Sequence, residues 1–323
     1  MKRQNNLKVA FFGLLSLAAV SGFAADLESD LDLWVSGGKW PRSDRAEEST
    51  PSRQYARAKQ FELVGDARQA AIAWERLAFS FPESDEAEEA LIFSAKNHLA
   101  AGSFTKCRAM IEELRRRYAN PTYLDAMGQV EAELGRGYLE GKGEGGTFAL
   151  ASRVRKARRI FQHILDEDSE GRWADDALLG LGQCDEADGR FDTAIEKYKK
   201  LLDKYPRSEL RAETEGRIAI CINRREPRPQ YTESDTMEAL NRIQAAYKEA
   251  EFGPTNLDKV ALQENERVLR DRQAEKRFDQ ARFYQTNRRF RAAEVYYELI
   301  VKRYPDSPWS AKAAEELQKM RQR

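Results

Sequence analysis

Apolar residues recur at three- and four-residue intervals along much of this chain. The clearest example has its apolar positions at Phe191, Ala194, Ile195, Tyr198, Leu201 and Leu202. This spacing places them on one face of a helix. Tyr205 and Pro206 end the pattern, because proline cannot continue a helix. A second amphipathic stretch precedes it at residues 175–184, and the turn Asp188-Gly189-Arg190 lies between the two. The pattern therefore predicts a helical hairpin.

The second half of this hairpin occurs twice in the chain. Residues 189–208 read GRFDTAIEKYKKLLDKYPRS, and residues 288–307 read RRFRAAEVYYELIVKRYPDS. The seven identical pairs are Arg190/Arg289, Phe191/Phe290, Ala194/Ala293, Tyr198/Tyr297, Tyr205/Tyr304, Pro206/Pro305 and Ser208/Ser307. Such self-similarity indicates a repeat architecture.

Small residues give the register of the repeats. They occur at Ala58, Ala95, Ala132, Gly182, Ala219 and Ala281. The step is 37 residues, apart from a 13-residue insertion before Gly182 and a longer step before Ala281. A hydrogen or methyl side chain lets two helices approach closely where they cross. The pattern resembles the tetratricopeptide (TPR) consensus at Leu178, Leu181, Gly182, Phe191, Ala194, Tyr198 and Pro206. We therefore predict an all-α protein, a right-handed α-solenoid of about six TPR-like hairpins.

Two repeats carry insertions, which we place in the turns between their helices. The first is the glycine-rich stretch at residues 135–146, and the second is residues 224–234 with Pro227 and Pro229. Residues 257–286 contain neither glycine nor proline and predict one long helix that joins the fifth hairpin to the sixth. We divide the repeats into an N-terminal set at 51–169 and a C-terminal set at 170–323.

The N-terminus has the layout of a secretory signal peptide. Residues 1–8 carry three positive charges, residues 9–20 form an apolar run, and Gly22-Phe23-Ala24 supplies small residues for cleavage. We expect a signal peptide at 1–24, cut after Ala24 or Ala25, and a flexible leader at 25–50. The alternative is an uncleaved anchor, although the apolar run is short for a membrane span. The expected location is the periplasm.

Composition excludes several partners. The chain of 323 residues has 54 Lys and Arg against 54 Asp and Glu, so no net field favours nucleic acid or an anionic membrane. The basic runs 115–117, 153–159 and 224–225 are interpreted as solvated faces. Cys107, Cys184 and Cys221 are expected to be buried free thiols. None of them lies near the cleavage site, so a lipid-bearing cysteine is not predicted.

No catalytic, cofactor-binding or metal-binding site is predicted. His98 and His163 are the only histidines, and neither has a cysteine or second histidine at metal-ligand spacing. We interpret His98 as a packed ring beside Ala95. Gly141, Gly143 and Gly146 match G-x-G-x-x-G, but no predicted strand precedes them, so a flexible loop is the better interpretation. An enzyme acting on peptidoglycan or polysaccharide would need a non-repeat catalytic region. The repeats leave no room for one.

The remaining candidate is a surface that binds protein partners. Stacked hairpins form a concave face that receives extended or helical peptide segments. In the repeat register, the residues expected to point to this face are Tyr55, Lys59, Glu62, Ile92, Lys96, Leu99, Gln183, Phe278 and Arg282. Any of them could instead support a neighbouring helix.

The C-terminal half carries a more specific resemblance. The matching stretches are Gln230-Tyr231-Thr232, Ala239-Leu240, residues 269–276, Ala281-Arg282-Phe283-Tyr284, Ala292-Ala293 and residues 304–307. In order and spacing they resemble the BamD-type outer-membrane assembly lipoproteins over roughly residues 160–323. The chain departs from this family in lacking the lipobox cysteine and in having about six repeats where five are usual.

The resemblance implies a function. It implies a periplasmic scaffold, peripherally associated with the outer membrane, whose partners are a BamA-type barrel-assembly protein and unfolded outer-membrane proteins. In the family, the C-terminal repeats dock on the barrel-assembly protein and the N-terminal groove receives substrate segments. Similar repeats occur in periplasmic coordinators of cell-wall synthesis and cell division, which is the alternative function.

Overall fold

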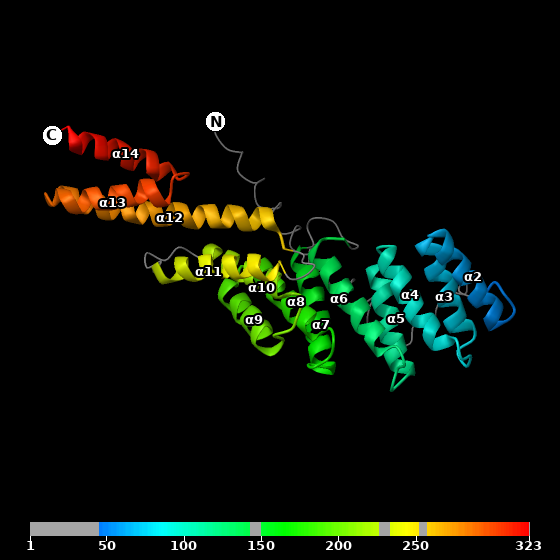
Figure 1. Ribbon diagram of the computed structural model, residues 1–323. Coiled ribbons are helices and arrows are strands. Elements are labelled where there is room, and N and C mark those ends of the chain that lie inside the picture. Colours follow the sequence, from blue (N-terminus) through cyan, green and yellow to red (C-terminus); the bar gives the residue numbers. More distant parts are fainter. Residues whose placement is uncertain (1–44, 143–149, 226–232, 252–256, 323) are drawn as a thin grey trace, which may run out of the picture. The chain divides into compact units, whose positions relative to one another are not determined.

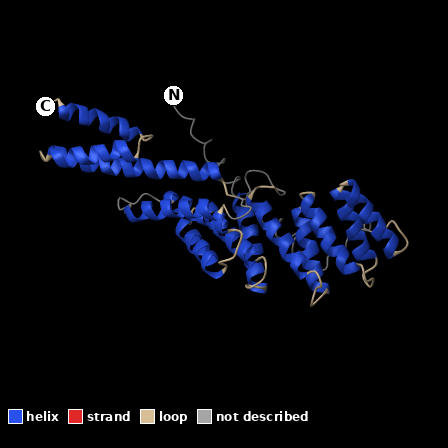
Figure 2. Cartoon of the chain, viewed as in Figure 1, coloured by secondary structure: helices blue, strands red, loops and turns tan. Residues whose placement is uncertain are grey.

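The computed structural model describes residues 45–142, 150–225, 233–251 and 257–322. Every regular element in these ranges is an α-helix (Figure 2). The chain divides between Ala149 and Leu150 into two compact units. The helices of the first unit are α2 (Pro51–Val64), α3 (Ala67–Ser80), α4 (Ala87–Ala100), α5 (Phe104–Arg117) and α6 (Leu124–Leu139).

The second unit contains the remaining helices. They are α7 (Leu150–Glu167), α8 (Ala174–Ala187), α9 (Phe191–Lys204), α10 (Arg211–Arg224), α11 (Glu233–Glu249), α12 (Lys259–Thr286), α13 (Phe290–Arg303) and α14 (Pro308–Arg321). Within each unit, helices that follow one another in the chain pack as antiparallel neighbours (Figure 1). The predicted all-α fold of consecutive hairpins is confirmed, and α12 is the predicted long helix.

Among the described residues of the second unit, α12 contributes to two clusters of buried apolar side chains. The first joins α8, α9, α10 and α11 to the N-terminal half of α12, with Leu262 and Leu269 fully buried. The second joins the C-terminal half of α12 to α13 and α14 around Phe278 and Tyr297. Because α12 contributes to both, its 28 residues connect the last hairpin to the preceding repeats.

The two copies of the duplicated stretch make the same kind of contact with the preceding helix. Tyr198 and Tyr297 are both fully buried. The Tyr198 hydroxyl donates a hydrogen bond to Glu186 of the preceding helix, and the Tyr297 hydroxyl donates to Oε1 of Gln285 over 2.7 Å. Each buried phenol thus obtains the partner that a buried polar group requires. The repetition in sequence reflects a repeated helix-to-helix contact.

The predicted register of small residues is confirmed. Ala58, Ala95, Ala132, Ala219 and Ala281 are completely buried, and Gly182 is buried as well. A Cβ atom at Gly182 would lie 2.2 Å from a ring carbon of Tyr198. This distance leaves no space for a methyl group. The hydrogen side chain of Gly182 therefore allows α8 and α9 to pack closely together.

We expect Gly182→Ala to destabilise the protein by up to about 2 kcal/mol. Alanine would gain up to about 1 kcal/mol in helix propensity, whereas overpacking against Tyr198 costs about 1–3 kcal/mol. Urea unfolding followed by circular dichroism measures the difference. In a Tyr198→Leu background the same substitution should cost nothing, because the clashing ring is gone. An equal cost in both backgrounds would contradict the contact.

The structure corrects the position of the first insertion. The stretch 135–146 was expected to be a loop, but α6 continues to Leu139. A Cβ atom at Gly137 would lie 2.6 Å from the Phe104 ring, which also packs edge-on against Tyr138. This glycine therefore serves helix packing rather than loop freedom. Residues 143–149 of the first insertion and 226–232 of the second lie outside the described residues.

Both ends of the repeat array carry features that the register did not include. Helix α14 follows the sixth hairpin, with Ser307 as its N-cap and Pro308 at its first turn. Near the start, the backbone N–H of Ala46 donates to Ser80 Oγ, and those of Glu47 and Glu48 donate to Gln54 Oε1. Residues 46–48 of the proposed leader are thus held by α2 and α3. The predicted signal peptide at 1–24 and leader residues 25–44 lie outside the described residues.

Candidate partner-binding surface

Three aromatic rings form the base of the surface in the first unit. The fully buried ring of Trp74 on α3 lies between Tyr55 of α2 and Phe93 of α4. Tyr55 meets it edge-on with the ring centroids 4.9 Å apart, and Phe93 stacks on it at 5.2 Å. Both outer rings are only half-buried. The first helices of two repeats therefore each place an aromatic ring against one buried tryptophan.

Lys59 lies over this aromatic base. Its Nζ is 3.9 Å from the centroid of Phe93, 5.1 Å from that of Trp74 and 5.7 Å from that of Tyr55. A cation at these distances is attracted by the negative faces of the rings. Lys96 adds a second ammonium group, 5.6 Å from the centroid of Phe93. Two ammonium groups therefore lie close to the half-buried Phe93 ring.

Glu62 holds Trp74 and Lys59 in this arrangement. Its Oε1 accepts hydrogen bonds from Trp74 Nε1 at 2.9 Å and from Asn97 Nδ2 at 2.8 Å, while Oε2 lies 3.1 Å from Lys59 Nζ. One carboxylate therefore links α2, α3 and α4. Its hydrogen bonds orient the tryptophan and the lysine together, so the surface is preorganised.

The surface continues towards α6. The Tyr55 hydroxyl donates to Glu89 Oε1 over 3.2 Å. Burial raises the pKa of Tyr55 above its usual value, and the nearby Glu89 carboxylate raises it further. Tyr123, at the N-cap of α6, has its pKa raised by burial and then by Glu89 and Glu88. Both phenols therefore stay protonated and can donate hydrogen bonds at neutral pH. We call Tyr55, Lys59, Glu62, Phe93, Lys96 and Tyr123 the aromatic–lysine surface.

The predicted residues divide into three groups. Tyr55, Lys59, Glu62 and Lys96 are brought together, and Leu99 is half-buried on the same helix as Lys96. Ile92 is only 1% exposed and Phe278 8% exposed, so these two side chains pack in the interior and offer no surface to a partner.

The last two predicted residues lie in the second unit. Gln183 donates a hydrogen bond to Glu213 Oε1 over 3.2 Å, which links α8 to α10. Arg282 is exposed on α12. Neither belongs to the aromatic–lysine surface.

Four contributors were not among the predicted surface residues, namely Phe93, Tyr123, Trp74 and Asn97. Phe93 follows Ile92 directly and lies three positions before Lys96, so the helical period could have included it. Trp74 and Asn97 act through contacts with Glu62, 12 and 35 residues away in sequence. No local pattern encodes such pairs.

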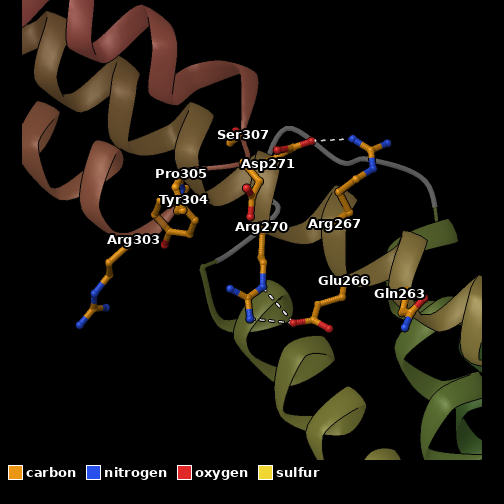
Figure 3. A pocket seen from close by; sticks show the side chains of 10 residues that line it. Gln263, Glu266, Arg267, Arg270, Asp271, Arg303, Tyr304, Pro305 and Ser307 are labelled. Carbon is orange, nitrogen blue, oxygen red and sulfur yellow. Dashed lines mark hydrogen bonds and ion pairs between the residues drawn. The ribbon is translucent and has the colours of Figure 1, made fainter.

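A separate open cleft lies in the second unit, between α12 and the turn before α14. It measures about 310 Å³ and is lined by Gln263, Glu266, Arg267, Arg270 and Asp271 of α12 and by residues 303–307 (Figure 3). Arg270 pairs with Glu266 at 2.7 Å, and Arg267 pairs with Asp271 at 3.0 Å. These charges compensate one another, so the described α12 residues that line the cleft present no unpaired charge to select a ligand.

The histidines and cysteines occupy structural positions. His98 and Glu75 are both buried, with His98 Nε2 3.0 Å from Glu75 Oε2. His163 Nε2 lies 3.6 Å from Glu167 Oε1, one turn away on α7. All three cysteines are free and buried, as predicted. Burial raises the pKa of Cys184 to about 12 and also raises the pKa values of Cys107 and Cys221, so these thiols stay protonated.

Comparison of the sequence with protein families identifies one of the predicted repeats. The tetratricopeptide repeat model matches residues 176–208, which span α8, α9 and the turn between them. These residues therefore form a tetratricopeptide repeat. Comparison with curated protein sequences finds no match. Among the helices that the structure describes, none combines the length and apolar character needed to cross a membrane.

Several solved TPR structures are similar to this chain. YrrB, described as a TPR protein with an unusual peptide-binding site, is 12% identical with a TM-score of 0.42, over 69% of this chain and 92% of its own. MamA AMB-1 is 14% identical with a TM-score of 0.40, over 63% and 93%. A thermophilic TPR protein of Thermus thermophilus is 17% identical with a TM-score of 0.37, over 68% and 98%.

Proposed function

We propose that this chain is a non-enzymatic scaffold that binds a segment of a protein partner on the aromatic–lysine surface. The observation that carries this proposal is the arrangement of Lys59 and Lys96 around the half-buried ring of Phe93. Such a surface offers an apolar contact and the ammonium group of Lys96, while Lys59 is paired with Glu62. It suits a peptide with an apolar residue beside a carboxylate. TPR proteins are in general scaffolds of this kind, which supports the non-enzymatic assignment.

The finer proposal is a role in outer-membrane β-barrel assembly, with the protein in the periplasm. It is supported by the resemblance of residues 160–323 to the BamD-type lipoproteins and by the signal-peptide layout of residues 1–24. The proposed partners are a BamA-type barrel-assembly protein, bound by the C-terminal repeats, and unfolded outer-membrane proteins, bound by the N-terminal repeats.

Affinity purification from the native envelope tests both the scaffold function and the role in β-barrel assembly. The tagged chain would be expressed in its own organism and extracted in gentle detergent, and co-purifying proteins would be identified by mass spectrometry. Near-stoichiometric recovery of a barrel-assembly protein is expected. Recovery of cell-wall synthases or division proteins, without a barrel component, would replace this role by the alternative one.

A pair of matched variants tests the surface itself. Lys96→Glu reverses one charge beside Phe93, and we expect it to reduce recovery of unfolded outer-membrane proteins at least about tenfold, since like charges across an interface are strongly unfavourable. Lys106→Glu makes the same change at an exposed position on α5 and should leave recovery unchanged. Equal recovery with both variants would remove the aromatic–lysine surface from the proposal.

A further inference from the structure

The turn between α12 and α13 carries a second surface, unrelated to the aromatic–lysine surface. We call it the Arg–Phe tip and define it as Arg282, Phe283, Arg288, Arg289, Phe290 and Arg291. The side chains of Phe283 and Phe290 are 64% and 46% exposed. The four arginines are exposed as well. Large apolar rings of this kind among basic groups mark an interaction surface.

The positive charge of the Arg–Phe tip is uncompensated. No acidic residue occurs between Asp279 and Glu294. Within the described part of the chain, the guanidinium groups of these four arginines make no hydrogen bond or ion pair. Earlier arginines on α12 behave differently, since Arg267, Arg270 and Arg277 each pair with a carboxylate at 3.0 Å or less. The tip therefore keeps its charge free for a partner.

The backbone at Arg288 adopts a conformation that is uncommon for residues other than glycine. Arg288 has φ of 59°, in the left-handed region. Its counterpart in the α8–α9 turn is Gly189, with φ of 74°, and glycine adopts this conformation without strain. Placing arginine here costs about 1 kcal/mol or more. The turn thus holds a basic side chain at a position where the repeat geometry favours glycine.

The aromatic base of the tip is well packed. Tyr284 stacks on Tyr296 of α13 with centroids 5.3 Å apart, and Phe283 meets Tyr284 edge-on at 5.7 Å. The hairpin behind the tip is therefore fixed by ring contacts, while the arginines and the phenylalanine faces point to solvent. A partner would find a preorganised surface, which reduces the entropy cost of binding.

The sequence contains a segment with the complementary pattern. Residues 26–35 read DLESDLDLWV, with four carboxylates among four aliphatic residues and one tryptophan, and the first basic residue after them is Lys39. Four acidic groups thus match the four unpaired arginines, and the apolar residues match the exposed phenylalanines. If the signal peptide is cut after Ala24 or Ala25, this segment begins at or next to the mature N-terminus.

We propose that residues 26–35 of one copy of this chain bind the Arg–Phe tip of a second copy. Each copy carries both the acidic segment and the basic tip, so the contact is heterologous and joins copies head to tail. Complementary charges also raise the rate of encounter and make association sensitive to salt. The inference goes beyond the proposed function and does not depend on the identity of the partner protein.

Sedimentation velocity on residues 25–323 tests the proposal. In 50 mM NaCl we expect self-association that strengthens from 1 to 100 µM protein and weakens at least about tenfold in 500 mM NaCl, because exposed charge pairs are screened. Arg288→Glu/Arg289→Glu should abolish association, and Asp30→Lys/Asp32→Lys should do the same. Combining the two double substitutions should restore it, since the opposite charges then face each other again.

A matched control separates this contact from general charge effects. Lys302→Glu/Arg303→Glu makes the same charge change at exposed positions of α13, away from the tip, and should not alter association. Arg288→Gly keeps the backbone conformation without the guanidinium and should weaken association in a protein that is fully folded by circular dichroism.

Three outcomes would overturn the proposal. The first is a monomer at every concentration in 50 mM NaCl, and the second is association that survives both charge reversals. The third is binding to vesicles that contain phosphatidylglycerol, lost with Arg288→Glu/Arg289→Glu in a protein that does not self-associate. That result would assign the Arg–Phe tip to an anionic membrane surface.

Discussion

Trp74→Ala is expected to lower the free energy of unfolding by about 3–5 kcal/mol, the range for removing a large aromatic side chain from a core. The Trp74 side chain is completely buried and contacts the rings of Tyr55 and Phe93. Its loss would leave a cavity between α2, α3 and α4. It would also remove a hydrogen-bond donor to Glu62 and the ring beneath Lys59. Urea unfolding followed by far-ultraviolet circular dichroism measures the change.

Two control variants are needed to interpret the stability change of Trp74→Ala. Trp74→Phe keeps a ring between Tyr55 and Phe93 but removes the indole N–H, so it should cost clearly less than alanine. Leu63→Ala deletes a side chain that is 88% exposed on α2 and should change stability by no more than about 0.5 kcal/mol. A cost below about 1 kcal/mol for Trp74→Ala would show that the aromatic base does not hold the first two repeats together.

The repeat register could be read from the sequence because it depends on local rules. A small residue is needed wherever two helices cross closely, and this requirement returns with each repeat from Ala58 to Ala281. Helix ends followed from Pro206 and Pro305, and the long α12 followed from the lack of glycine and proline. These features act over a few residues, so a single sequence reveals them.

Other features depend on contacts between elements and were not predictable in this way. By sequence Gly137 favours a loop, but it lies inside α6, where a Cβ atom would clash with the Phe104 ring. Ile92 lies one position from Phe93 on α4, yet only Phe93 reaches the surface. The difference depends on how the neighbouring helices cover each position. The helical period predicts which residues share one face of a helix. Packing against the neighbouring helices determines which of them remain accessible to a partner.

Ala293→Trp is expected to have a large effect at the other end of the chain, lowering the free energy of unfolding by about 3 kcal/mol or more. Ala293 is fully buried in the core that α12, α13 and α14 share with Phe278 and Tyr297. The crossing of α12 and α13 has room for a methyl group but not for an indole, so the two helices would be forced apart. Because α14 packs on both, it would lose its support as well.

The measurement is a thermal melt by circular dichroism, combined with hydrogen exchange of residues 273–322. Val295→Trp is the matched control, since Val295 lies on the same helix with its side chain 62% exposed. It should leave the melt unchanged. The core formed by α8, α9, α10 and α11 should keep its protection in both variants, because Leu262 and Leu269 of α12 pack there independently of Ala293. An unchanged melt for Ala293→Trp would contradict the repeat register. Loss of protection throughout the second unit would show instead that α12 couples its two cores into one cooperative unit.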